Sequence, residues 1–228
     1  MQDAALFLRC RDLVKINLAI KTKFFFYTLL AIVALLVCFV TYQAMTSQTV
    51  NYWLKDKTRT TADYTLFLGS SSIARLPVPL VSKCKPVVVY GFENGTTESI
   101  ESYLRFADMQ QAKHIVLYIG ENDIAQGENY LQTAEQLNDI VSDLLNSTDA
   151  KISIMTVKPS PRRIQFHEDF RLFNTKIKDV WMDVNSTPRV SFIAFDTIRN
   201  PIYYVQDGVH LNRRGYQLLS GMINEACV

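Results

Sequence analysis

The sequence predicts an α/β domain, doubly wound around a parallel five-stranded sheet of flavodoxin-like type and preceded by one transmembrane helix. Five short apolar runs, rich in β-branched and aromatic residues, follow one another without polar alternation, as in strands buried on both faces. The segments between the runs are long enough for helices, and regular strand–helix alternation implies right-handed crossovers. A long apolar stretch without charges near the N-terminus predicts the additional helix.

The predicted transmembrane helix covers residues 24–43. No charged residue lies between Lys23 and Lys55, and residues 24–40 are almost wholly apolar. About 20 residues span a bilayer, whereas the apolar core of a cleaved signal peptide has about 7–15 and a small-residue cleavage site after it. "TYQAMTSQ" offers no such site, and a buried core helix would carry a polar stripe. We therefore expect a retained membrane anchor.

Charges around the anchor predict its orientation. The first cation after it is Lys55, whereas the segment before it is basic, with Arg9, Arg11, Lys15, Lys21 and Lys23. The positive-inside rule places residues 1–23 in the cytoplasm and everything after the span outside the inner (plasma) membrane, in the periplasm of a bacterium or otherwise in a lumen. Residues 44–62 are polar and predict a stalk, which leaves residues 63–228 as the exported domain.

Each element of this domain is predicted from a local pattern. The second of four predicted helices, for example, has apolar residues at helical spacing, including Leu137, Ile140 and Leu144. The predicted strands are 64–69, 86–91, 114–120, 151–157 and 190–196, and the predicted helices are 96–110, 131–146, 169–184 and 212–225. Ligands bind beyond the carboxyl ends of the strands in such sheets, so the residues that follow each strand are candidates for chemistry.

Polar groups follow the strands at this rim. The first strand ends in "GSSS", the second in "GFENGTT", the third in "GENDI" and the fourth in "KPSPRR", and "DGVHLNRRGY" precedes the last helix. These residues suit acyl transfer: Ser71 as nucleophile, His210 as its base, and Asp207 as the carboxylate that orients the histidine. The Ser71 and Gly95 N–H groups and the Asn122 side chain would form an oxyanion hole.

Taken singly, each motif also has a structural explanation. A serine–glycine cluster is usually a flexible loop, and an Asp-x-x-His pair is often a helix cap beside a solvated histidine. Asn122 suits a turn, and Gly91 and Gly95 could serve backbone geometry alone. "KPSPRR" is most simply a proline-held loop, with Lys158, Arg162 and Arg163 as alternative contacts for an anionic substrate. We expect structural or surface roles for His114 and His167.

Together the motifs resemble the four blocks of the SGNH (GDSL-type) hydrolases. The match covers residues 65–228, and "GEND" and "DGVHLNRRGY" are its most diagnostic parts. Ser71 matches the nucleophile of that family, and Asn122, Asp207 and His210 match its later blocks. The second block departs from the common Gly-x-Gly-Gly turn by Glu93 and Asn94, and Gly95 is its candidate oxyanion donor, with Gly91 behind it. An α/β-hydrolase is disfavoured because its serine lies in Gly-x-Ser-x-Gly, whereas residue 73 is Ile.

The predicted function is an outward-facing, membrane-anchored serine esterase. Its expected substrate is a small acyl ester, most simply an O-acetyl group on envelope or extracellular polysaccharide. The alternatives are a lysophospholipase or thioesterase, an acyltransferase using the same residues, and a non-catalytic envelope binding module. No cofactor or metal is expected, because Cys and His do not cluster, and the net charge of +2 gives no support for nucleic-acid binding. Cys84 and Cys227, both on the exported side, could form a disulfide.

Overall fold

The computed structural model describes residues 23–43, 46–182 and 188–227. The chain divides into two compact units, Met1–Asn51 and Tyr52–Val228. Cys10 and the predicted cytoplasmic cations before Lys23 lie outside the described residues.

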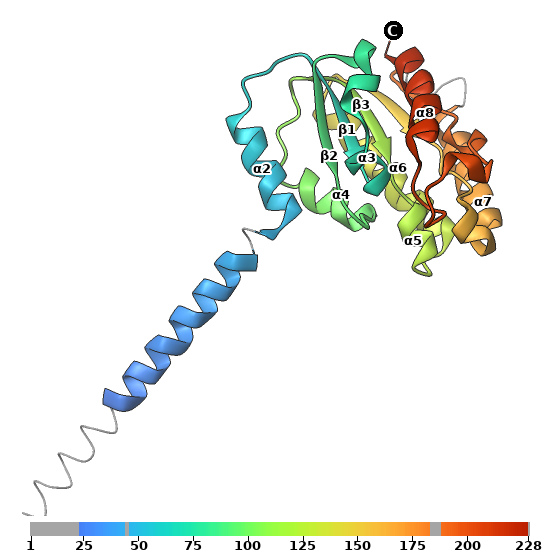
Figure 1. Ribbon diagram of the computed structural model, residues 1–228. Coiled ribbons are helices and arrows are strands. Elements are labelled where there is room, and N and C mark those ends of the chain that lie inside the picture. The colour runs from blue at the N-terminus through green and yellow to red at the C-terminus, as the bar shows by residue number, and fades with distance from the viewer. Residues whose placement is uncertain (1–22, 44–45, 183–187, 228) are drawn as a thin grey trace, which may run out of the picture. The chain divides into compact units, whose positions relative to one another are not determined.

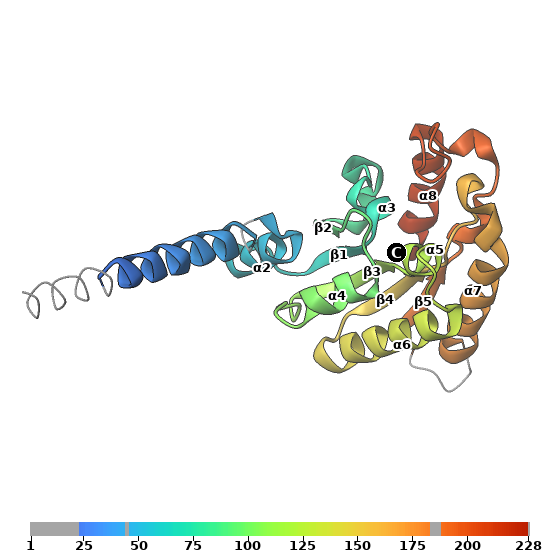
Figure 2. The ribbon, with the colours of Figure 1, turned by 90° about the horizontal axis from the view of Figure 1, so that it is seen from below.

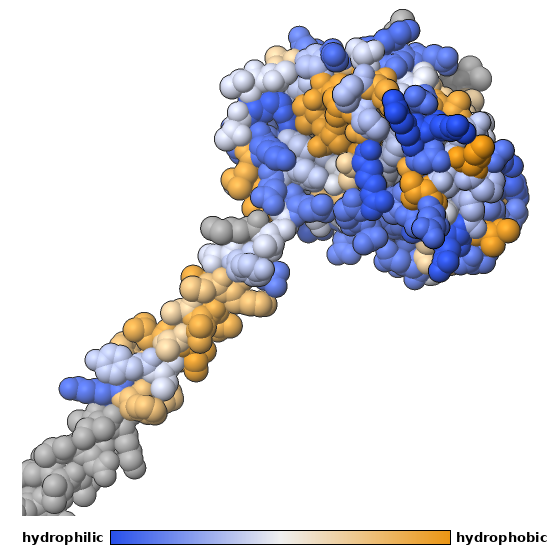
Figure 3. Space-filling view, viewed as in Figure 1, coloured by the Kyte–Doolittle hydropathy of each residue, from blue (hydrophilic) through white to orange (hydrophobic). Residues whose placement is uncertain are grey.

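The first unit contains a helix over Lys23–Gln43 with a mean hydropathy of 2.6. All of its described side chains are exposed, and most of its surface is apolar (Figure 3). Among the described residues it is the one helix long and apolar enough to cross a membrane, by length and composition, and a signal sequence passes the same test. The helix thus coincides with the predicted anchor.

The second unit is built on a parallel sheet (Figure 1), and its strands lie in the order β2-β1-β3-β4-β5 (Figure 2). This order confirms the predicted doubly wound class, because the chain leaves β1 for β2 on one side and returns to β3 on the other. The strands are β1 (Tyr64–Gly69), β2 (Val87–Gly91), β3 (Ala112–Tyr118), β4 (Lys151–Met155) and β5 (Val190–Ile193); the helices are α2 (Gln48–Thr58), α3 (Ser71–Ala74), α4 (Thr97–Leu104), α5 (Glu121–Ala125), α6 (Tyr130–Ser147), α7 (His167–Trp181) and α8 (Arg213–Ala226); the 3₁₀ turns are η1 (Val78–Leu80), η2 (Ser82–Cys84), η3 (Pro161–Phe166), η4 (Phe195–Thr197) and η5 (Pro201–Tyr203).

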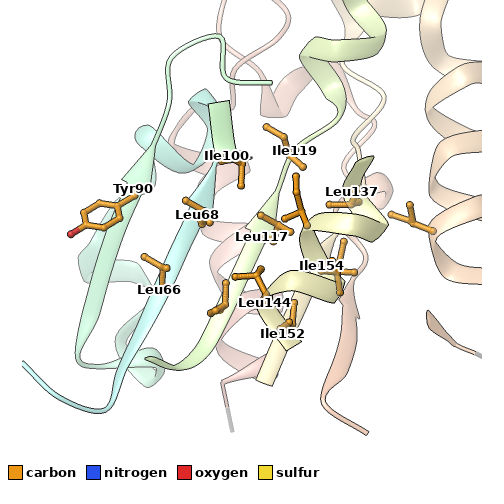
Figure 4. Packing of buried hydrophobic residues seen from close by; sticks show 14 of the residues in the cluster. Leu66, Leu68, Tyr90, Ile100, Leu117, Ile119, Leu137, Leu144, Ile152 and Ile154 are labelled. Carbon is orange, nitrogen blue, oxygen red and sulfur yellow. The ribbon is translucent and has the colours of Figure 1, made fainter. Parts of the chain in front are cut away.

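Helices cover both faces of the sheet (Figure 2). Alternate strand side chains, such as Leu66 and Leu117, pack toward α4, α6 and α7 in the larger core (Figure 4). Their neighbours Phe67 and Val116 belong to a second core on the α3 and α8 side. The strands are apolar at nearly every position because both faces are buried, which is why they showed no polar alternation in the sequence.

Part of the segment predicted as a polar stalk folds with the domain. Residues 48–58 form α2, and the second unit begins within this helix, at Tyr52. Asp56 is buried and accepts hydrogen bonds from the hydroxyls of Tyr90 (2.9 Å) and Tyr103 (2.6 Å), and it pairs with Arg59. A buried carboxylate with this many partners is part of a packed structure. The compact unit therefore begins at Tyr52, before the predicted residue 63.

A disulfide joins Cys84 to Cys227. Cys84 ends η2 and is buried, and Cys227 directly follows α8, so the bond ties the C-terminal helix to the segment between α3 and β2. Cys38, in the N-terminal helix, is free and exposed. The pairing that the sequence left open is thus formed in the structure.

His114 has a structural environment, as expected. It lies on β3, is 8% exposed, and its Nε2 is 2.8 Å from the Ser153 hydroxyl on β4. Burial, together with a smaller effect of the nearby Lys151 charge, lowers the pKa of His114 from 6.5 to about 4. The folded protein therefore keeps this imidazole neutral at a pH where the unfolded chain would protonate it.

We expect His114 to make the protein less stable as the pH falls from about 6.5 to about 4. In that window the unfolded state binds a proton that the folded state does not, so the free energy of unfolding decreases by up to about 3 kcal/mol. Thermal unfolding measured between pH 4 and 7 should show a flatter pH dependence for His114→Gln than for the wild type. His167→Gln is the matched control, and equal slopes for all three proteins would contradict the prediction.

Candidate functional site

Ser71 stands at the first turn after β1, at the start of α3. The end of β1 lies close to β3, because the Ser70 N–H donates to the Tyr118 carbonyl at the end of β3 (3.0 Å). Gly69 allows this approach: a Cβ at that position would lie 2.1 Å from the Tyr118 oxygen. The glycine in "GSSS" is therefore required by the contact between β1 and β3, and that contact places Ser71 at the switch point of the sheet.

Ser71, His210 and Asp207 form a continuous chain of hydrogen bonds. The Ser71 Oγ is 2.9 Å from the His210 Nε2, and the His210 Nδ1 is 2.7 Å from the Asp207 Oδ2. An ionised Asp207 only accepts hydrogen bonds, so the proton of a neutral His210 resides on Nδ1. Nε2 is then free to accept the Ser71 proton, which is the tautomer required of a general base.

The Asp207 carboxylate is kept ionised by its own loop. Burial raises its pKa, but hydrogen bonds from the His210 side chain and from the backbone N–H groups of His210 and Val209 outweigh this and lower it to about 2. The loop is held on both sides: Arg162 N–H donates to the Gly208 carbonyl, and Asn212 caps α8 through the N–H groups of Arg214 and Gly215. The spacing of Asp207 and His210 thus follows from a turn that directly precedes a capped helix.

The predicted oxyanion donors lie on α3 (Ser71), on α5 (Asn122) and in the loop after β2 (Gly95), and Asn122 contacts Gly95. The Asn122 Nδ2 on α5 donates to the Gly95 carbonyl (2.9 Å). The Gly95 N–H donates to the Phe92 carbonyl (3.0 Å), within a turn that contains Asn94 at a positive φ. In the described part of the chain, the Ser71 N–H and the second Nδ2 hydrogen of Asn122 have no other acceptor, so they are freer than Gly95 to meet an oxyanion.

Other residues of the rim fix the backbone. Gly91 allows close packing, because a Cβ there would lie 2.1 Å from the Ala74 nitrogen of α3. Asp123 accepts from both the N–H and the hydroxyl of Thr97 (2.8 Å each) and so holds the start of α4 beside α5. His167 is also structural, since its Nε2 donates to the Ser160 carbonyl. These contacts favour structural roles for Gly91 and Asp123.

A buried ionic cluster behind Asn122 was not foreseen from the sequence. The Glu121 carboxylate accepts from Lys158 (2.5 Å), from the Tyr118 hydroxyl (2.6 Å) and from Ser160 (3.0 Å). Burial raises the pKa of Glu121, but the charges of Lys158 and Arg163 outweigh it and the net shift is downward. Lys158 is completely buried, so the idea that it contacts an anionic substrate is wrong.

Glu93, the unusual residue of the second motif, forms an ion pair at the surface. Its Oε2 is 3.1 Å from the Arg75 Nη2, and the Arg75 Nε also donates to the Glu93 Oε1. Both side chains are nearly half exposed, and exposed pairs contribute little to stability. The pair nevertheless links the loop that carries Gly95 to α3, the helix that begins with Ser71.

Comparisons with known proteins agree with this architecture. The family model described as GDSL-like Lipase/Acylhydrolase matches residues 49–218. A comparison with curated proteins found no match.

Several solved structures share the fold at low sequence identity. One from Streptococcus pneumoniae, whose description names platelet activating factor, is 20% identical with a TM-score of 0.68, and the alignment covers 86% of this chain and 99% of that one. The acetyl xylan esterase AlAXEase is 14% identical with a TM-score of 0.56 and coverages of 72% and 100%. A family 3 carbohydrate esterase from Clostridium thermocellum is 15% identical with a TM-score of 0.55 and coverages of 72% and 94%.

We expect Asp207→Asn to reduce kcat by about 10²–10⁴-fold with little change in thermal stability. The carboxamide can donate to Nδ1, which would move the histidine proton to Nε2 and abolish its ability to accept from Ser71. The measurement is p-nitrophenyl acetate hydrolysis by the full chain in detergent, together with its melting temperature. Asp139→Asn, on the exposed side of α6, is the control, and an Asp207→Asn kcat within threefold of wild type would contradict the assignment.

Proposed function

Because this chain belongs to the GDSL-like lipase/acylhydrolase family, we propose that it hydrolyses small acyl esters at Ser71, Asp207 and His210. The chain is a serine ester hydrolase by its family and fold. The observation that carries the residue assignment is the hydrogen-bonded chain from the Ser71 Oγ through the His210 imidazole to the Asp207 carboxylate. No metal ion or organic cofactor enters the proposed reaction.

The proposed reaction has two halves. The Ser71 Oγ attacks the ester carbonyl carbon while His210 Nε2 takes its proton, and Asp207 stabilises the imidazolium. The intermediate collapses to an acyl-serine as His210 protonates the departing alcohol. Water, deprotonated by His210, then attacks the acyl-serine, and the second intermediate releases the carboxylic acid and returns the proton to Ser71.

The oxyanion of both intermediates would be met by three donors. These are the Ser71 N–H, the free Nδ2 hydrogen of Asn122, and the Gly95 N–H, shared between the Phe92 carbonyl and the oxyanion. Such donors act mainly in the transition state, where charge has developed on the oxygen. Because the Gly95 N–H already has an acceptor, we expect it to be the weakest of the three.

We propose an O-acetyl ester on a carbohydrate as the substrate class. Two of the similar structures are carbohydrate esterases by their descriptions, which supports this choice. A longer acyl chain is the second candidate, supported by two exposed apolar residues, one adjacent in sequence to Arg163 and one hydrogen-bonded to His210. Ile164 is 72% exposed and follows Arg163, and Val205 is 41% exposed and donates its N–H to the His210 carbonyl.

We also propose that the apolar helix Lys23–Gln43 anchors the protein in the inner (plasma) membrane, with the N-terminus cytoplasmic and the hydrolase domain outside. The basic residues before the helix support this orientation. The disulfide between Cys84 and Cys227 supports it independently, because such bonds persist in oxidising compartments and are rare in the cytosol.

We expect Ser71→Ala to reduce ester hydrolysis by about 10³-fold or more, because the nucleophile is lost. The full chain would be assayed in detergent on p-nitrophenyl acetate, butyrate and octanoate, with Ser72→Ala as the matched control from the same turn. A preference for acetate supports the proposed substrate class, and a preference for octanoate supports the lipid alternative. Product analysis with an added acceptor alcohol separates acyl transfer from hydrolysis.

Equal rates for the wild type and Ser71→Ala would refute the assignment of Ser71. A folded wild type that neither hydrolyses any of these esters nor reacts with a fluorophosphonate probe would instead favour the binding module. Reaction with the probe but not with the esters would retain the catalytic serine and exclude this substrate class.

For the topology, we expect cysteine trapping in intact cells to detect the disulfide. A PEG-maleimide applied after acid quenching and denaturation should modify two of the four cysteines without reductant and all four with it. The variant Cys84→Ser/Cys227→Ser should give two in both conditions. Four modified thiols in the unreduced wild type would show that the domain resides in a reducing compartment, and the proposed orientation would be wrong.

A further inference from the structure

We propose that Arg163 is a positioning residue that holds the Asn122 carboxamide with its nitrogen toward the oxyanion. The inference rests on the proposed esterase function and adds to it a residue outside the catalytic chain of hydrogen bonds. Arg163 lies in η3, after β4, and its side chain is 19% exposed. It therefore has limited access to substrate, and it acts through Asn122.

The Arg163 guanidinium spans two consecutive residues of α5. Its Nη2 donates to the Asn122 Oδ1 (2.8 Å), and its Nη1 donates to the Glu121 backbone carbonyl (3.2 Å). The same Nη1 lies 3.3 Å from the Glu121 Oε1. A planar fork with donors in fixed directions can make these contacts together, whereas a lysine ammonium on a flexible stem cannot reproduce them.

These contacts allow only one orientation of the Asn122 amide. A guanidinium has donors but no acceptor, so the atom that faces Arg163 must be the amide oxygen. On the other side, the Gly95 carbonyl only accepts, so the atom that faces it must be the amide nitrogen. A flipped amide would place its N–H groups against those of Arg163 and its oxygen against the Gly95 carbonyl. It would also remove the Asn122 N–H donor from the oxyanion hole.

Arg163 is itself held by the buried cluster on Glu121. The Glu121 carboxylate is fixed by Lys158, Ser160 and the Tyr118 hydroxyl, all of which are buried. The adjacent residue connects this cluster to the rest of the site, because the Arg162 N–H donates to Gly208, between Asp207 and His210. The "KPSPRR" segment thus supports both the oxyanion hole and the base.

The guanidinium also strengthens the donor that it orients. A cation at the amide oxygen draws electron density from the nitrogen, and hydrogen bonds in such a chain polarise one another. The gain is largest when the oxyanion carries full charge, so loss of Arg163 should lower kcat and leave KM nearly unchanged.

The test is a double-mutant cycle on the full chain in detergent with Arg163→Met, Asn122→Ala and the double variant. We expect Arg163→Met to lower kcat by about 10–10²-fold and Asn122→Ala by about 10²–10³-fold, each with KM within threefold of wild type. The double variant should be within threefold of Asn122→Ala, because Arg163 has no other route to the reaction. Arg171→Met, whose partner Glu168 is exposed on α7, is the control.

Two outcomes overturn the proposal: a wild-type kcat in Arg163→Met, or losses that multiply in the double variant. If Arg163→Met does not fold, the cycle is run with Arg163→Lys, which retains the charge but not the fork. The same criteria then apply to its loss of kcat.

A second readout does not depend on turnover and separates this proposal from the proposed function. In the full chain labelled with ¹⁵N-asparagine, the Asn122 side-chain NH₂ signal is identified by its absence from Asn122→Ala. We expect this signal to shift in Arg163→Met and to stay in place in Arg171→Met. If the wild type hydrolyses no ester, the esterase proposal fails while this shift still supports the role of Arg163; an unmoved signal refutes that role in either case.

Discussion

The site depends on one backbone contact, the hydrogen bond from the Ser70 N–H to the Tyr118 carbonyl. It joins the carboxyl ends of β1 and β3, the two strands between which the winding direction of the sheet reverses. The residues that follow these strands, Ser71 and Asn122, emerge beside one another for that reason. No side chain can occupy the contact, since a Cβ on Gly69 would overlap the Tyr118 oxygen. The proposed nucleophile and the proposed amide donor are therefore brought together by sheet topology, before any side-chain interaction between them is considered.

The other residues of the proposed site, Asp207 and His210, come from the C-terminal part of the chain. The loop with Asp207 and His210 precedes α8, whose C-terminal end is tied by the disulfide to the segment after α3. The segment after β4 lies between the two halves, with Arg162 bonded to Gly208 and Arg163 bonded to Asn122. Displacing that segment would disturb the acid–base loop and the amide donor together, although it contributes no atom to the proposed chemistry.

The fold was predictable because burial of both faces of a strand makes nearly every one of its residues apolar. β1 occupies the predicted residues 64–69, β3 is shifted by two residues, and each of the other strands differs by one to three residues at one end. The contact between Asp207 and His210 in the proposed triad was predictable because the two residues lie at a spacing that a single turn imposes. The packing of residues 48–58 against the domain could not be predicted from the sequence, because "QTVNYWLKDKT" is polar in composition. Its one buried charge, Asp56, is stabilised by Tyr90 and Tyr103, which lie 34 and 47 residues away.

The same reasoning explains why the alternative role of Lys158 in "KPSPRR", as a contact for an anionic substrate, was wrong. Cations at the rim of an active site suggest an anionic substrate only if they are exposed, and burial cannot be inferred from a proline-rich hexapeptide. Lys158 and Glu121 are buried side by side as an ion pair. Neither charge could be buried without the other, because an unpaired ion inside a protein carries a large desolvation penalty. Glu121 is next to Asn122 in sequence, so the carboxylate that holds the two cations and the amide oriented by one of them belong to the same turn of α5. A charge cluster whose sequence suggests a substrate contact is, in this structure, an internal support for the proposed oxyanion donor.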